Sequence, residues 1–116
     1  MKSGSFVIGV FASALLAVVI TAPPRHAMAA GESPSAEIKI DNFSFAPQTV
    51  TVAAGTQVIW TNQDDIPHTV VSEDKTTFKS HALDTDEKFS FTFTKPGTYT
   101  YFCSIHPKMT AKVVVQ

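Results

Sequence analysis

The chain has 116 residues, which is enough for one domain. Nine Lys and Arg stand against ten Asp and Glu, and this balance, with no basic run to hold phosphates, excludes nucleic acid as a main partner. The single cysteine excludes an intramolecular disulfide.

Residues 1–29 have the pattern of a secretory signal peptide. Lys2 gives the start a weak positive charge, residues 6–20 form an apolar run, and a small-x-small triplet occupies 27–29. We therefore predict cleavage after Ala29 and export to the periplasm. The alternative is an uncleaved membrane anchor, but the apolar run is short for a membrane span and a cleavage site follows it.

The chain that remains after cleavage has about 87 residues, which is small for a self-sufficient core, and exported domains of this size commonly use disulfides or a metal. Its net charge is −3, and its one thiol is Cys103. Residues 30–36 are small and polar, so we expect a flexible N-terminal lead there and a folded domain over 37–116. Because no disulfide can form, metal ligation is a reason to retain the thiol.

From Glu37 onward, apolar and polar residues alternate with a period of two, which predicts strands rather than helices. The clearest example is Phe89, Phe91 and Phe93, separated by Ser and Thr. Strands are expected within 37–47, 49–52, 57–62, 69–72, 89–94, 98–102 and 111–115. Seven or eight short strands at this spacing predict an all-β fold, a Greek-key antiparallel β-sandwich.

The segment 103–109 offers a thiolate, an imidazole and a thioether, with two residues between each pair: Cys103, His106 and Met109. A second imidazole is available upstream at His68. Two His, one Cys and a weak axial Met form the ligand set of blue-copper electron-transfer sites. Soft sulfur suits Cu(I) and nitrogen suits Cu(II), so a mixed set lets the ion change oxidation state with little rearrangement.

Each of these residues also has an ordinary structural explanation. A lone Cys is commonly a small buried hydrophobe, and a lone Met commonly fills a core. Here Cys103 is the one cysteine and Met109 the one methionine after residue 29, and both stand at a fixed distance from His106. This combination favours one shared metal site at one end of the sandwich. We interpret His81 as a solvated loop residue rather than a second metal ligand or an electron port.

The chain resembles the cupredoxin family, the type I blue copper proteins, from about Glu37 to Val115. The spacing from Cys103 through His106 to Met109 matches the short ligand loop of amicyanin, whereas plastocyanins and pseudoazurins have two more residues between His and Met. The other shared motifs are Phe45-x-Pro47, Val52-x-x-Gly55, Val58-x-Trp60-x-Asn62, Pro67-His68-Thr69-Val70, Phe91-x-Phe93 and Pro96-Gly97-Thr98-Tyr99-x-Tyr101-x-Cys103.

The resemblance implies that His68, Cys103, His106 and Met109 hold one copper ion. Many members have Asn after the first His ligand, where its side chain braces the Cys loop. This chain has Thr69 at that position, and a hydroxyl can make a similar hydrogen bond.

The resemblance also implies a periplasmic protein that carries single electrons between larger redox proteins. The donor would be a dehydrogenase such as methylamine dehydrogenase, and the acceptor a c-type cytochrome. We expect a monomer with no membrane contact after cleavage. Four protein ligands leave no open position for a substrate, so we expect no enzymatic activity.

Two other classes of protein remain open. A periplasmic copper-binding or delivery protein would use several exposed Met and Cys, whereas this chain has one Met at the ligand spacing. A hydrolase would use Cys103 as its nucleophile, but the sequence offers no recognisable base or oxyanion site.

We expect electrons to leave through His106, because its loop is short and lies between two strands. An exposed apolar patch around the imidazole would mark the contact with a redox partner. The residues expected in this patch are Ile105, Pro107, Ile66, Pro67 and Ala54.

Overall fold

The computed structural model describes residues 3–4, 9, 14–20 and 33–116. The chain divides into two units, residues 1–30 and residues 31–116. The predicted cleavage site at 27–29 lies outside the described residues. Within the described ranges, no helix is long and apolar enough to cross a membrane.

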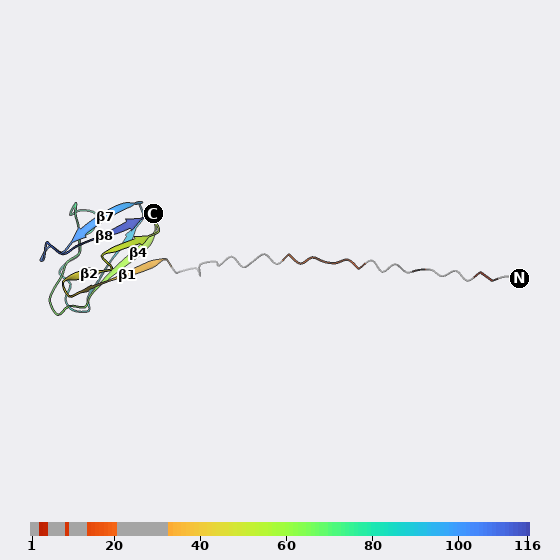
Figure 1. Ribbon diagram of the computed structural model, residues 1–116, viewed down its shortest axis with the longest axis horizontal. Helices are drawn as coiled ribbons and strands as arrows, with labels where there is room; N and C mark the ends of the chain where they lie inside the picture. Colours follow the sequence, from red (N-terminus) through yellow and green to blue (C-terminus); the bar gives the residue numbers. More distant parts are fainter. Residues whose placement is uncertain (1–2, 5–8, 10–13, 21–32) are drawn as a thin grey trace. The chain divides into compact units, whose positions relative to one another are not determined.

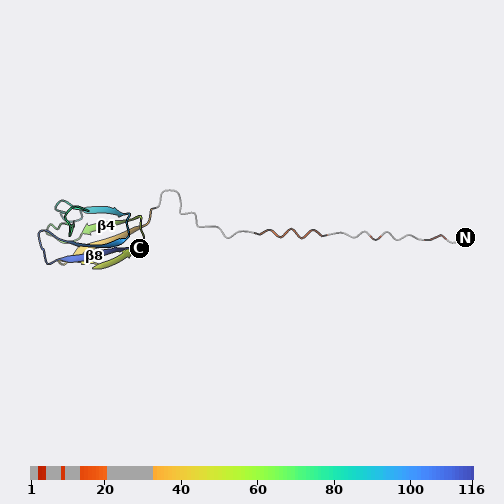
Figure 2. The same ribbon diagram turned by 90° about the horizontal axis from the view of Figure 1, so that it is seen from above.

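Residues 33–116 form the predicted β-sandwich of eight strands, which lie in two layers (Figures 1 and 2). One sheet has the strand order β2-β1-β4-β6 and the other has the order β3-β8-β7-β5. The strands are β1 (Ser35–Asp41), β2 (Ser44–Ala46), β3 (Thr49–Val52), β4 (Thr56–Asn62), β5 (Val71–Ser72), β6 (Lys88–Phe93), β7 (Gly97–Phe102) and β8 (Thr110–Val115).

Both sheets are mixed rather than purely antiparallel. The pairs β1–β4 and β3–β8 run parallel, and the other four strand pairs of residues 33–116 are antiparallel. The expectation of an antiparallel sandwich is therefore wrong at two pairs, because alternation shows which side chains face the core but not the direction of the neighbouring strand. β1 begins at Ser35, two residues before the predicted start of the domain, since its pairing with β4 extends to Ser35.

Apolar side chains of both sheets fill the space between them. In β4 every second residue from Thr56 to Asn62 is buried, which follows the predicted alternation. Fully buried side chains include Ile38 of β1, Trp60 of β4 and Val113 of β8. Full burial of one such side chain contributes about 1.5–3 kcal/mol. Most of this core lies outside residues 103–109, so we expect the fold to persist without a metal.

Candidate metal centre

The loop 103–109 joins β7 to β8 and is closed by backbone hydrogen bonds. The N–H of Cys103 donates to the carbonyl of Met109 over 3.0 Å, and the N–H of Met109 donates to the carbonyl of His106 over 2.9 Å. The N–H of His106 donates in turn to the carbonyl of Cys103 over 3.2 Å. These bonds fix the three candidate ligand residues of the loop relative to one another.

His68 reaches the same place from the connection between β4 and β5. It exchanges two backbone hydrogen bonds with Leu83, at 3.1 and 2.7 Å. The buried side chain of Asn62 donates to the carbonyls of Ile66 and Leu83, both over 2.8 Å. The backbone around His68 is therefore held by hydrogen bonds to Asn62, at the end of β4, and to Leu83, in the connection between β5 and β6.

The structure brings His68, Cys103 and His106 together. The Cys103 Sγ lies 3.7 Å from the Nδ1 of His68 and 3.7 Å from the Nδ1 of His106, and the three donor atoms are all within 4.8 Å of one another. His68 and Cys103 are fully buried, whereas His106 is half-buried. Met109 is buried in the core cluster that contains Cys103. Two imidazole nitrogens around one thiolate suit copper in both oxidation states.

Thr69 lies beside the sulfur of Cys103 and offers it two hydrogen-bond donors. Its N–H donates to the Sγ over 3.4 Å, and its Oγ1 lies 3.7 Å from the same atom. Ser104 donates its N–H to the Thr69 Oγ1 over 2.7 Å, and the two hydroxyl oxygens are also 2.7 Å apart. The hydroxyl of Thr69 thus connects the two segments that carry the candidate ligands.

This environment favours the thiolate form of Cys103. Burial raises the pKa of the thiol, but hydrogen bonds, led by the one from the N–H of Thr69, outweigh burial and lower the pKa to about 6. A thiolate is the form that binds a metal.

In the metal-free protein, we expect Cys103 to make stability depend on pH. The pKa of the thiol falls from its ordinary value of 9.0 to about 6 on folding, so the stabilising contribution is complete above pH 9.0 and is lost as the pH falls through about 6. Denaturant unfolding of the wild type and of Cys103→Ser should show the difference in the free energy of unfolding grow from pH 6 to pH 9.0. A difference that stays constant over this range would contradict the thiolate.

Two neighbours of the centre were not identified from the sequence. The ring of Phe43 meets the rings of His68 and His106 edge to face, with centroids 5.7 and 5.2 Å away. Asp64 accepts a hydrogen bond from the Nε2 of His68 over 2.7 Å. In the sequence, Phe43 continues the apolar alternation expected within 37–47, and Asp64 belongs to a polar loop. Alternation and polarity alone therefore do not distinguish these two residues from ordinary strand and loop residues.

Of the residues expected around His106, Ala54 lies at the other end of the sandwich. Its N–H donates to the carbonyl of Gln116, beyond the end of β8, whereas the ligand loop meets β8 at Thr110. The parallel pairing of β3 with β8 causes this difference. Ile105, Pro107 and Pro67 are exposed and Ile66 is half-buried.

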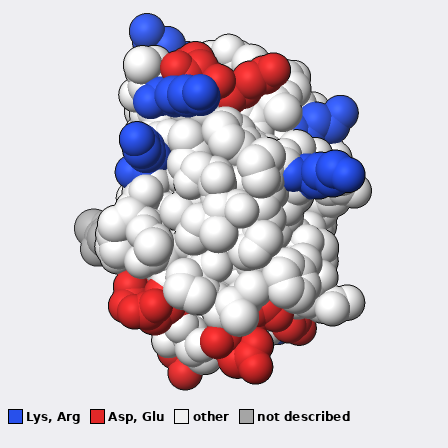
Figure 3. Space-filling view, turned by 90° about the vertical axis from the view of Figure 1, so that its left-hand side faces the viewer, with Lys and Arg blue, Asp and Glu red and all other residues white. Residues whose placement is uncertain are grey.

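Figure 1 shows β8 starting at the left-hand end of the sandwich, so the ligand loop lies there. Figure 3 shows this end of the molecule as a broad surface without charged side chains, with Lys and acidic residues around its margin. Such a surface suits contact with another protein.

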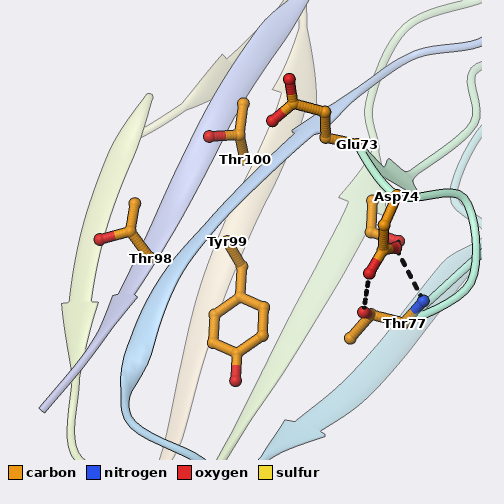
Figure 4. A pocket seen from close by; sticks show the side chains of 7 residues that line it. Glu73, Asp74, Thr77, Thr98, Tyr99 and Thr100 are labelled. Carbon is orange, nitrogen blue, oxygen red and sulfur yellow. Dashed lines mark hydrogen bonds between the residues drawn. The ribbon is translucent and has the colours of Figure 1, made fainter.

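Two polar side chains away from the metal centre, Asp74 and His81, have structural partners. A surface hollow of about 340 Å³ beside β5 and β7 is lined by Glu73, Asp74 and Tyr99 among others (Figure 4). Hydrogen bonds from Ser72 and Thr77 hold the pKa of Asp74 well below its usual value, so this carboxylate serves the turn that contains it. His81 is exposed, and its Nε2 lies 3.2 Å from Glu87, which agrees with a solvated loop residue.

Residues 10–115 match the family model described as a cupredoxin-like domain. Amicyanin-alpha from Methylorubrum extorquens is 38% identical, over 91% of this chain and 96% of that protein. A chloroplastic plastocyanin from Tetradesmus obliquus is 36% identical, over 62% of this chain and 58% of that protein. Among solved structures, a purple cupredoxin from Nitrosopumilus maritimus has a TM-score of 0.67 and 33% identity, covering 70% of this chain and 99% of that one.

Proposed function

Because the chain belongs to the cupredoxin family and its cofactor is copper, we propose that it is a periplasmic blue copper protein that carries single electrons between larger redox proteins. We propose His68, Cys103, His106 and Met109 as the ligands of one copper ion. The observation that carries this proposal is the buried sulfur of Cys103 beside two imidazole Nδ1 atoms, each 3.7 Å away.

Bound copper would supply a centre that alternates between Cu(I) and Cu(II). The residues supply the rest of the function. Thr69 holds the Cys103 sulfur in one position through its N–H, and burial of Cys103 and His68 keeps water from their donor atoms. A site fixed in this way changes little when its charge changes, which favours rapid electron transfer. His106 is half-buried and is therefore the ligand residue through which electrons would leave.

We propose residues 1–29 as a cleaved signal peptide and the sandwich as the mature domain. The donor would be a dehydrogenase such as methylamine dehydrogenase, and the acceptor a c-type cytochrome. The protein would act as a monomer and would not itself be an enzyme, because the proposed ligands leave no position for a substrate.

Replacing Met109 with Gln should lower the reduction potential. The thioether is a weak axial ligand that favours Cu(I), whereas an amide oxygen favours Cu(II). Cyclic voltammetry of the copper-loaded wild type and variant measures the effect, and Lys108→Gln in the same loop is the matched control. A potential that stays the same or rises in Met109→Gln would argue against an axial role for Met109.

Stopped-flow mixing tests the proposed carrier function. The reduced, copper-loaded protein is mixed with an oxidised c-type cytochrome, and the oxidised protein is mixed with a reduced dehydrogenase. We expect one electron per chain to pass in each reaction. Copper transfer to the partner without electron transfer would contradict the carrier function and support a delivery protein.

A further inference from the structure

We propose that Asp64 is a positioning residue that holds the aromatic ring of Phe43 and the imidazole of His68 in one arrangement over the metal centre. This inference rests on the proposed function, because the arrangement matters for a copper ion held by His68 and His106. It assigns a task to a loop carboxylate that is not itself among the proposed ligands.

The carboxylate of Asp64 joins two segments of the chain. Its Oδ1 accepts the N–H of Asn42 over 2.7 Å, and its Oδ2 accepts the N–H of Phe43 over 3.0 Å. The same Oδ2 lies 2.7 Å from the Nε2 of His68. One side chain therefore connects the turn between β1 and β2 with a proposed ligand.

Asp64 is itself held in place. Its N–H donates to the Oδ1 of Asn62 over 2.9 Å, and its carbonyl accepts the hydroxyl of Thr85 over 2.6 Å. The carboxylate is thus a fixed acceptor.

The turn that Asp64 binds has an unusual backbone. Asn42 has a φ of 49° and Phe43 a φ of 57°, both in the left-handed region. Asn adopts this region readily, but a bulky residue such as Phe does so rarely, and the conformation persists where surrounding contacts hold it. The two N–H groups that Asp64 accepts belong to these two residues, so the carboxylate directly stabilises this conformation.

The left-handed turn places the ring of Phe43 against both imidazoles. Its plane stands at 88° to the ring of His68 and at 88° to the ring of His106, an edge-to-face arrangement. Phe43 is 54% exposed, so the residue lies partly in solvent and partly against the two imidazoles. A ring packed against His106 in this way opposes movement of its imidazole.

Asp64 also fixes the tautomer of His68. An ionised carboxylate only accepts hydrogen bonds, so the proton of the neutral imidazole is on Nε2, and Nδ1 presents a lone pair toward Cys103. Outer hydrogen-bond partners of this kind raise metal affinity, and their loss typically lowers it by about 10–100-fold. A carboxylate that only capped the turn would leave copper affinity unchanged when it is replaced.

The test compares Asp64→Asn with Asp65→Asn, which removes the same charge one residue away at an exposed position. Competition with a Cu(I) chelator should show copper binding at least about tenfold weaker in Asp64→Asn and unchanged in Asp65→Asn. In NMR spectra of the reduced protein, the amide of Phe43 should exchange with solvent faster in Asp64→Asn alone. Equal affinities in the two variants would overturn the role of Asp64 at the metal centre.

Phe43→Leu separates the ring from the carboxylate. It keeps the N–H that Asp64 accepts and removes the aromatic edge, so we expect copper to leave the reduced protein faster than in the wild type, with the hydrogen bond between Asp64 and His68 intact. Release at the wild-type rate would overturn the role of Phe43.

If the wild type lacks the charge-transfer band of a blue copper site, the proposed function fails. The exchange rate of the Phe43 amide then still tests whether Asp64 holds the turn.

Discussion

Replacing Cys103 with Ser should abolish the visible charge-transfer band of the copper-loaded protein and leave the sandwich folded. The band arises from transfer of an electron from thiolate sulfur to Cu(II), and a hydroxyl oxygen does not provide it. The fold should persist because most of its core consists of buried apolar side chains outside the loop, such as Ile38, Trp60 and Val113. Absorption spectroscopy measures the first effect, and circular dichroism with denaturant unfolding measures the second.

The matched control for this substitution is Lys108→Ser. Lys108 is exposed in the same loop and is not among the proposed ligands, so its replacement should leave the band unchanged. A Cys103→Ser protein that keeps the band would contradict the role of the thiolate. A variant that is unfolded without copper would contradict the metal-independent core.

Introducing Glu beside His106 should slow electron transfer to the partner at least about tenfold, because loss of an interface contact worth 1.4 kcal/mol changes affinity by this factor. Pro107 is exposed in the loop that carries His106, and Ile66 is half-buried two residues before His68, so each substitution introduces a charge near a proposed ligand. Neither residue is a proposed ligand, so the visible spectrum should not change. Stopped-flow measurement with a c-type cytochrome gives the rate.

Ala82→Glu is the control for these variants. Ala82 is exposed beside His81 and is not among the residues expected in the apolar patch around His106, and the new charge is the same. We expect its electron-transfer rate to stay close to that of the wild type. Equal slowing in all three variants would show that net charge governs the rate, and slowing by Ala82→Glu alone would place the docking surface elsewhere.

The sequence predicted the metal centre because most of its information is local. Cys103, His106 and Met109 belong to one loop, and their roles are restricted because Cys103 is the one cysteine and Met109 the one methionine after residue 29. The predicted cupredoxin fold, family and copper cofactor are confirmed. The roles of the four residues as ligands stay predictions that the substitutions above test.

The contacts that the sequence did not reveal join segments far apart in the chain. Asp64 binds the N–H groups of Asn42 and Phe43, which are 22 and 21 residues earlier. Alternation in β1 and β2 predicts strand residues there, but it does not predict a left-handed Phe whose ring turns toward two imidazoles. Such a contact depends on how the loop before His68 packs against the turn, and the apolar alternation of the sequence does not predict this packing.

The misplacement of Ala54 has a related cause. An antiparallel pairing of β3 with β8 would bring the turn at Gly55 to the same end as the ligand loop. The parallel pair β3–β8 instead places this turn beside Gln116. Phe43, rather than Ala54, is the apolar residue that lies against His106.

The most direct test of the copper electron carrier is a redox titration of the copper-loaded protein followed by absorption spectroscopy. We predict one copper per chain, an intense thiolate-to-Cu(II) band in the oxidised protein, and complete, reversible loss of this band on addition of one electron per chain. A Cu(II) form without the band, or copper that is released when the protein is reduced, would contradict a type I copper site that carries electrons.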